Sequence, residues 1–143
     1  MAGMVPSPTQ ATHAMEFHWN LGPLADGLGC YRREQFFEAH EHWEILWRKS
    51  QGPEKSFLQA LIQMAGGFHH LQRNNLQGAT ALLSAALRRL EPYPARFEGM
   101  EVAGLREDLR RWLQALEAKD SRLRPPYPQL SFDVSPREAG QGR

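Results

Sequence analysis

The balance between helix-favouring and strand-favouring residues constrains the fold of this chain most. The sequence holds 18 Leu and 16 Ala against 3 Val, 2 Ile and 3 Thr. Branching at Cβ restricts the side chain against the preceding turn of a helix, whereas Leu and Ala lose little conformational freedom there. Strands favour the β-branched residues that are scarce here. The composition therefore predicts an all-α fold.

Length, charge and cysteine usage narrow the class of protein. The 143 residues are enough for one domain, and a formal net charge of +1 gives no electrostatic reason to expect nucleic acid or an acidic membrane surface. Cys30 is the single cysteine, which excludes an internal disulfide framework and a multi-cysteine metal centre; we expect an inert buried thiol. No apolar run approaches the roughly 20 residues of a membrane span, and Met1–Met15 lacks the features of a secretory signal. We therefore expect a cytoplasmic protein.

Apolar residues recur every three or four positions along most of the chain, which predicts a compact array of about five helices. Their expected bounds are about 20–31, 34–49, 53–72, 76–91 and 102–116. Asn20 is the expected N-cap of the first helix, because its side chain can accept a hydrogen bond from the first turn.

The two ends of the chain have a different character. Residues 1–15 and 133–143 are polar and show no hydrophobic period, so we expect both to be disordered and residues 16–132 to form a single helical domain. Tyr127, Leu130 and Phe132 are expected to lie extended along the helices.

A faint internal repeat has a period of 40 residues. The seven residues that start at Arg33 align with those that start at Arg73, and Trp43 then corresponds to Leu83. In each copy a helix ends, turns, and is followed by a helix with a small alanine near its start. This pattern is typical of a tetratricopeptide-like helix pair, although that repeat has a period nearer 34. A chance likeness between two amphipathic helices explains the pattern equally well.

The stretch from Phe36 to Trp47 mixes aromatic residues with carboxylates and imidazoles. At 3.6 residues per turn, His40 shares an inward stripe with Trp43 and Trp47, and Glu44 lies one turn after His40. We expect Phe37, Trp43 and Trp47 to anchor the core. An imidazole and a carboxylate beside these rings need partners, because burying them unpaired costs several kcal/mol.

The third predicted helix supplies such partners. Gln63 and His70 fall on one of its stripes, and the pair Gly66-Gly67 lets a neighbouring backbone or a ligand approach closely. We therefore expect His70 to lie within direct or one-water hydrogen-bond reach of the residues on the second helix.

Three interpretations of this cluster stay open. The first is a buried hydrogen-bond network that fixes the register of the helices and needs no ligand. His40, Glu44 and His70 also form the ligand set of many zinc and iron sites, so a divalent metal (Zn, Fe or Mn) is the second interpretation. A metal-free acid/base site is the third. The spacing matches neither the His-Glu-x-x-His of zinc proteases nor the Glu-x-x-His of di-iron bundles.

The same residues carry a resemblance to a known family. The run from Phe36 to Glu41 followed by Trp43-Glu44, and the later run from Phe57 to Gln63, resemble the domain of unknown function 309 family over about residues 20–130. The resemblance implies a small all-α domain of prokaryotes and plastids with no assigned activity. Its signature implies shared polar residues at Glu38, His40, Glu41, Glu44, Gln63 and His70.

The chain departs from the family at Asn74, where the family has Gly. We expect Asn74 to adopt the left-handed backbone conformation, which Asn tolerates best after Gly.

These observations favour a binding or scaffold module whose polar cluster organises the core or takes a small ligand. The alternative is a metal-dependent enzyme, for instance a hydrolase, with Glu41 as general base. A third interpretation, an RNA-associated protein, rests only on the arginines at 88–89 and 106–111, which we expect to be solvated. A protein partner or small ligand is thus favoured over nucleic acid, and both enzymatic activity and homo-oligomerisation stay open.

Overall fold

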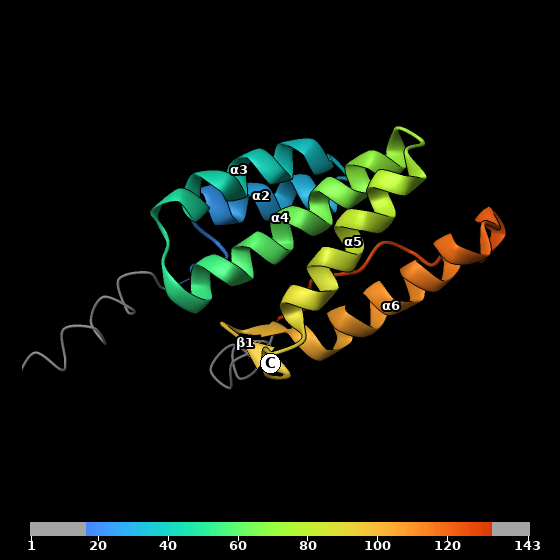
Figure 1. The fold of residues 1–143 in the computed structure, drawn as a ribbon. Coiled ribbons are helices and arrows are strands. Elements are labelled where there is room, and N and C mark those ends of the chain that lie inside the picture. The colour runs from blue at the N-terminus through green and yellow to red at the C-terminus, as the bar shows by residue number, and fades with distance from the viewer. Residues whose placement is uncertain (1–16, 133–143) are drawn as a thin grey trace, which may run out of the picture. The chain divides into compact units, whose positions relative to one another are not determined.

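A computed structural model describes residues 17–132 (Figure 1). These residues form five α-helices: α2 (Gly22–Arg32), α3 (Phe36–Lys49), α4 (Gly52–Gln72), α5 (Leu76–Leu90) and α6 (Val102–Ala118). The prediction of an all-α helical array is confirmed. The ends expected to be disordered, 1–15 and 133–143, lie outside the described residues.

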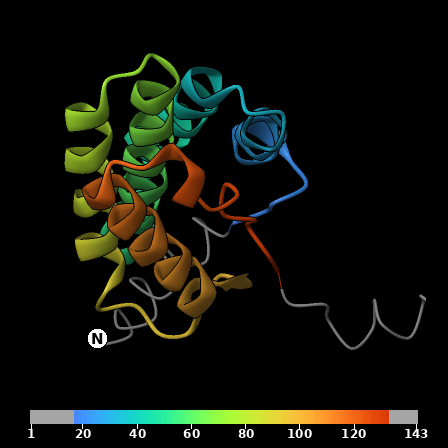
Figure 2. The ribbon, with the colours of Figure 1, turned by 90° about the vertical axis from the view of Figure 1, so that its right-hand side faces the viewer.

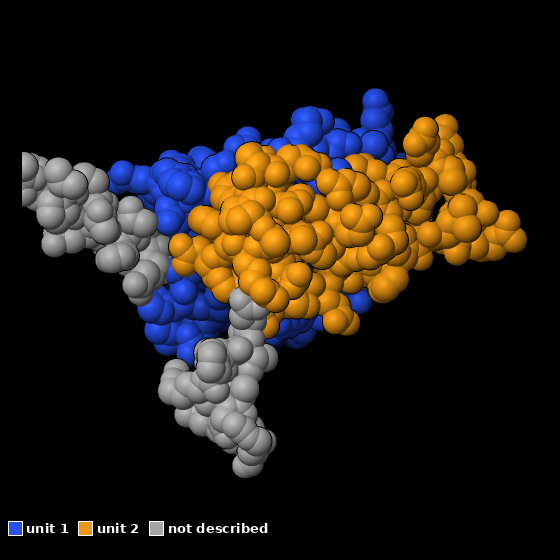
Figure 3. All heavy atoms as spheres, turned by 90° about the horizontal axis from the view of Figure 1, so that it is seen from below, with its two compact units in different colours: residues 1–89 blue, residues 90–143 orange. Residues whose placement is uncertain are grey.

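The chain divides into two compact units, residues 1–89 and 90–143 (Figure 3). The first contains α2, α3, α4 and nearly all of α5, and the second contains α6. A single domain over 16–132 stays a prediction. Within residues 17–132, no helix has the length and apolar character needed to cross a bilayer.

In the first unit, α2 to α5 follow one another side by side in chain order (Figures 1 and 2). Both α2 and α4 begin with a glycine-proline pair, Gly22-Pro23 and Gly52-Pro53. Each glycine has a φ of +63°, a backbone conformation that glycine adopts without strain, and proline suits the first helical turn. The N-cap of α2 is Leu21, so the prediction of Asn20 as the N-cap is wrong by one residue.

The turns after α2 and α4 have the same geometry. Glu34 and Asn74 are left-handed, with φ of 62° and 61°. Their backbone N–H groups donate to Tyr31 and Leu71, each at 2.9 Å. The two turns also touch, because Gln72 Nε2 donates to the carbonyl of Glu34 at 3.0 Å. The period of 40 residues is therefore present in the backbone, and the expected left-handed conformation of Asn74 is confirmed.

The pairs α2–α3 and α4–α5 also cross at equivalent positions of the 40-residue repeat. The position of a Cβ on Gly27 is already filled by the indole of Trp43, and a Cβ on Gly67 would lie 2.8 Å from Leu83 Cδ2. Each glycine thus admits a large side chain of the following helix. Trp43 is fixed further because its Nε1 donates to the carbonyl of Leu24 at 3.2 Å.

The buried stripe of α3 is narrower than predicted. Phe36, Ala39 and Trp43 are at most 1% exposed, whereas Phe37 is 46% exposed and Trp47 is partly exposed. Trp43 anchors the core as expected, but the same prediction for Phe37 and Trp47 is wrong. At 3.6 residues per turn, Phe37 lies roughly 100° around the helix from Phe36, and Trp47 lies about 40° from Trp43 in the same direction.

A small hairpin precedes α6 in the second unit. It pairs β1 (Arg96–Phe97) with β2 (Met100–Glu101). The two residues between the strands, Glu98 and Gly99, have φ of 50° and 82°, as a tight hairpin turn requires. The sequence predicted only a loop here, because runs of two residues carry no strand period.

The segment after α6 packs back onto this unit. Tyr127 stacks on Trp112 with ring centroids 5.6 Å apart, and Leu130 is buried. Phe132 forms an antiparallel bridge with Met100. The expected extended course of this segment is confirmed.

Candidate functional site

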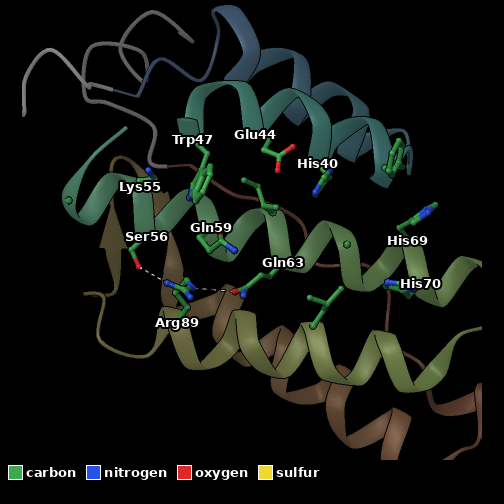
Figure 4. Close-up of a pocket in the computed structure, with 15 residues that line it drawn as sticks. His40, Glu44, Trp47, Lys55, Ser56, Gln59, Gln63, His69, His70 and Arg89 are labelled. Carbon is green, nitrogen blue, oxygen red and sulfur yellow. Dashed lines mark hydrogen bonds between the residues drawn. The ribbon is translucent and has the colours of Figure 1, made fainter. Parts of the chain in front are cut away.

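A groove of about 830 Å³ runs along α4 in the first unit, with α3 and α5 as its walls (Figure 4). Its floor is the stripe of α4 from Lys55 to His70, about 22 Å long at 1.5 Å per residue. Fifteen residues line it: Phe37, His40, Glu44 and Trp47 from α3; Gly52, Lys55, Ser56, Gln59, Ile62, Gln63, Gly66, His69 and His70 from α4; Leu82 and Arg89 from α5.

The wall formed by α3 is the line of residues that turns away from the core. Phe37 and Trp47 line the groove with His40 and Glu44, which lie between them along the helix, and Figure 4 shows the Trp47 ring over α4. The sequence predicted these aromatic rings in the core, because their spacing is helical and their side chains are apolar. Their partial exposure makes them available to a bound molecule instead.

Four of the six predicted polar residues line the groove and two do not. His40, Glu44, Gln63 and His70 are among the lining residues. Glu38 and Glu41 are exposed on α3, away from the groove lining. A role of these six residues in binding stays a prediction.

Direct hydrogen bonds do not join the predicted cluster. Among residues 17–132, the buried Nδ1 atom of His40 has no hydrogen-bond partner. Glu44 pairs with Arg48 at 3.5 Å, one turn further along α3. His70 Nδ1 lies 3.0 Å from Asn75 Nδ2. Direct bonds among the three residues are thus replaced by local ones, and one ring nitrogen is left unsatisfied, while a contact through one water stays a prediction.

Asn75 fixes the tautomer of His70. Asn75 Oδ1 accepts from the backbone N–H of Gly78 at 3.0 Å, which orients the amide so that its nitrogen faces the imidazole. An amide nitrogen only donates, so His70 Nδ1 accepts and the ring proton resides on Nε2. The turn after α4 thereby sets the orientation of a groove side chain.

Aromatic and imidazole rings gather at one end of the groove. The Phe37 ring stacks on His40 at 5.8 Å between centroids and lies 5.3 Å from His69. His69 in turn lies 6.1 Å from His70. The sequence does not single out His69 from an ordinary core or surface histidine. Its place in the sequence, three residues after Gly66, puts it on the groove face of α4.

The surroundings of His69 favour its neutral form. Partial burial lowers the pKa of the imidazole from its ordinary value of 6.5, and the positive charge of Arg73 lowers it further. Smaller effects come from His70 and His40, which lower the pKa, and from Glu38, which raises it.

Two cations mark the other end of the groove. Arg89 Nε donates to Gln63 Oε1 at 3.3 Å, and Nη1 donates to Ser56 Oγ at 3.2 Å. Lys55 Nζ lies 4.3 Å from the centroid of the Trp47 ring. Nothing in the sequence analysis separated Arg89 from the other arginines, which were expected to be solvated. Its spacing of seven from Leu82, two helical turns, is the signal that places both on one face.

The metal alternative has no assembled ligand set. Within the described part of the chain, no three His, Cys, Asp or Glu side chains are grouped so as to hold a metal ion. Coordination by His40, Glu44 and His70, with the exposed Glu41 as general base, stays a prediction.

Residues 24–82 match the family described as "Domain of unknown function (DUF309)". The resemblance to this family is confirmed over that segment, which is shorter than the expected 20–130. The segment contains every groove residue except Arg89. No curated protein matches the chain.

Proposed function

We propose that this DUF309-containing chain is a binding module that takes a small organic ligand in the groove along α4. The observation that carries the proposal is the groove itself, at about 830 Å³. Sites for small molecules are typically about 300–1,000 Å³ and combine apolar walls with a few convergent polar groups. A cytoplasmic location, and a small ligand in preference to nucleic acid, belong to the same proposal.

The lining supplies both kinds of contact. Phe37, Trp47, Ile62 and Leu82 offer apolar surface, with the two aromatic rings on the α3 wall. Ring faces of this kind contribute strongly to the binding of planar or apolar molecules. A ligand body lying along α4 would remove this surface from water.

The polar groups of the groove support the same proposal. A buried polar atom without a partner costs about 1–3 kcal/mol. His40 Nδ1 is such an atom, counting partners among residues 17–132, and His40 lines the groove. Because this atom is covered by the rest of the protein, a ligand would recover this free energy only when the imidazole turns its Nδ1 into the groove.

Gly66 supports the proposal through the shape of the floor. Glycine inside a helix destabilises it by about 1 kcal/mol relative to alanine. A Cβ on Gly66 would meet only Leu82 Cδ1, at 3.2 Å, so the neighbouring helix does not require glycine as strictly as it does at Gly67. Because Gly66 has no side chain, it leaves the floor of the groove open for a ligand, which accounts for a glycine at this helical position.

Ligand-observed NMR tests the proposal. Saturation-transfer spectra are recorded for a fragment set containing indole, benzamide, benzoate and phenyl phosphate. We expect at least one fragment to bind the wild type and to lose its signal with Gly66→Leu, which fills the floor. Gly104→Leu is the matched control, because Gly104 is an exposed helical glycine on α6.

Two results would overturn the proposal. The first is the absence of a saturation-transfer signal for every fragment with the wild type. The second is equal binding by the Gly66→Leu and Gly104→Leu variants. Elemental analysis of untagged protein adds a separate check, since stoichiometric zinc, iron or manganese would favour the metal-dependent enzyme instead.

A further inference from the structure

The charges of the groove are concentrated at the end where α4 begins. Lys55 and Arg89 both line that end. Neither forms an ion pair with any residue in the range 17–132. We infer that the ligand is an organic oxyanion, a carboxylate or a phosphate ester, whose charged group binds between Lys55 and Arg89. This inference rests on the proposed function and names the class of ligand.

Two hydrogen bonds already orient the guanidinium of Arg89 before an oxyanion binds. Its bonds to Gln63 Oε1 and Ser56 Oγ, at 3.3 and 3.2 Å, use Nε and Nη1 (Figure 4). Both acceptors are neutral, so the charge of the guanidinium is not compensated by them. A guanidinium whose orientation is already fixed loses less conformational freedom when it binds an oxyanion.

Lys55 is positioned by an aromatic ring. Its ammonium lies 4.3 Å from the centroid of the Trp47 ring, which is a cation–π contact. Such a contact orients the ammonium and leaves its charge in place, so an oxyanion can bind beside it. Trp47 thus contributes a ring face to the ligand body and holds one of the two cations.

The acidic residues nearby do not cancel this charge. Glu44 is the acidic residue of the lining, and its carboxylate pairs with Arg48 at 3.5 Å. Glu54, in the first turn of α4, is buried and is not among the lining residues. At this end of the groove the charged side chains among the lining residues are therefore those of Lys55 and Arg89, both positive.

The remaining lining of the groove determines which kind of organic group can carry the oxyanion. Along α4, Ile62 and Gly66 lie between Lys55 and His70, and Leu82 on α5 lies beside Gly66, so these three lining residues form the middle of the groove. This apolar stretch fits an aromatic or alkyl body. The ligand is therefore amphiphilic, with its charged group at Arg89 and its body directed towards the imidazoles.

Isothermal titration calorimetry with three probes tests the inference. Benzoate and phenyl phosphate carry the two oxyanions, and benzamide has the shape of benzoate without the charge. We expect both anions to bind and benzamide to bind at least about tenfold more weakly, since hydrogen bonds to charged groups are the stronger ones. The relative affinity of the two anions separates a carboxylate ligand from a phosphate ligand.

Arg89→Gln and Arg88→Gln form the matched pair of variants. Both residues are exposed on α5, and Arg88 does not line the groove. We expect Arg89→Gln to weaken the binding of both anions about tenfold or more while leaving benzamide unchanged. Arg88→Gln should leave all three affinities unchanged, and added NaCl should weaken only the anions.

The inference would be overturned if benzamide bound as tightly as benzoate, or if Arg89→Gln bound the anions as well as Arg88→Gln does. In either case, loss of binding in Gly66→Leu would leave the groove as a binding site for an uncharged ligand. The failure of the inference is thus distinct from the failure of the proposed function.

Discussion

Gly67 on α4 lies so close to Leu83 on α5 that a Cβ on the glycine would come within 2.8 Å of the leucine Cδ2. Forty residues earlier, Gly27 and Trp43 are related in the same way. The crossing of each helix pair thus depends on a glycine that accepts a bulky side chain. The adjacent Gly66 has a different role, because it lines the groove.

The adjacent glycines give the first prediction. Gly67→Ala should lower the free energy of unfolding by about 1–3 kcal/mol, because the methyl group forces Leu83 or the backbone of Ala79 to move. Gly66→Ala should leave stability unchanged or raise it by up to about 1 kcal/mol through helix propensity. Urea denaturation measures both. Equal destabilisation by the two substitutions would contradict the distinction between them.

The two tryptophans of α3 give the second prediction. Trp43→Ala should cost about 3–5 kcal/mol, since it leaves a large cavity in the core. Trp47→Ala should cost about 1–2 kcal/mol, because the ring is partly exposed and its partner Lys55 forms only a cation–π contact. The measurement is again the free energy of unfolding in urea. A larger loss for Trp47→Ala would mean that α3 is rotated from the orientation described.

The left-handed turn residues give the third prediction. Glu34 has a φ of 62°, so Glu34→Gly should raise stability by about 1 kcal/mol by removing an unfavourable side chain from that conformation. Asn74→Ala should lower stability by about 1 kcal/mol, for the corresponding reason. Glu41→Gly, at an exposed position in the interior of α3, is the control and should destabilise by about 1 kcal/mol. Thermal and urea unfolding would reveal whether Glu34→Gly instead destabilises, which would contradict the turn geometry.

His69 gives the fourth prediction, on pH. Burial and the charge of Arg73 lower the pKa of His69 in the folded protein below 6.5, so the unfolded chain binds the proton more readily. The contribution of His69 to stability is therefore favourable at high pH and is lost as pH falls below about 6.5. His69→Gln should reduce the drop in melting temperature between pH 7.5 and pH 5. An unchanged or larger drop in the variant would contradict the assigned direction.

The helices could be predicted from the sequence because their hydrophobic period and the residues at their ends are local features of the chain. The helices of the first unit begin at glycine-proline pairs or follow left-handed turns. Gly-Pro or Asn74 marks the start of α2, α4 and α5, whereas the turn before α3 has Glu34 at its left-handed position. The 40-residue repeat was visible only faintly, since Trp43 and Leu83 differ in chemistry although they fill equivalent positions. The hairpin at Glu98-Gly99 could not be predicted, because each of its strands is two residues long.

The groove was harder to predict than the helices. Apolar and aromatic residues occupy more than half of the circumference of α3, so periodicity alone does not decide which rings face the core. Phe37 and Trp47 therefore looked like core residues although they line a surface. Arg89 could not be distinguished from a solvated arginine, because its partners Gln63 and Ser56 lie on another helix.

Binding of an organic anion in the groove along α4 is tested by mapping which residues a small anion contacts. Two-dimensional ¹H–¹⁵N NMR spectra are recorded while benzoate or phenyl phosphate is titrated into the full chain. Binding in the groove predicts chemical-shift changes that begin at Lys55, Ser56 and Arg89 and continue along α4 to His70, with the amides of α6 unchanged. Binding with shift changes centred on α6, or spread without preference over the chain, would contradict it.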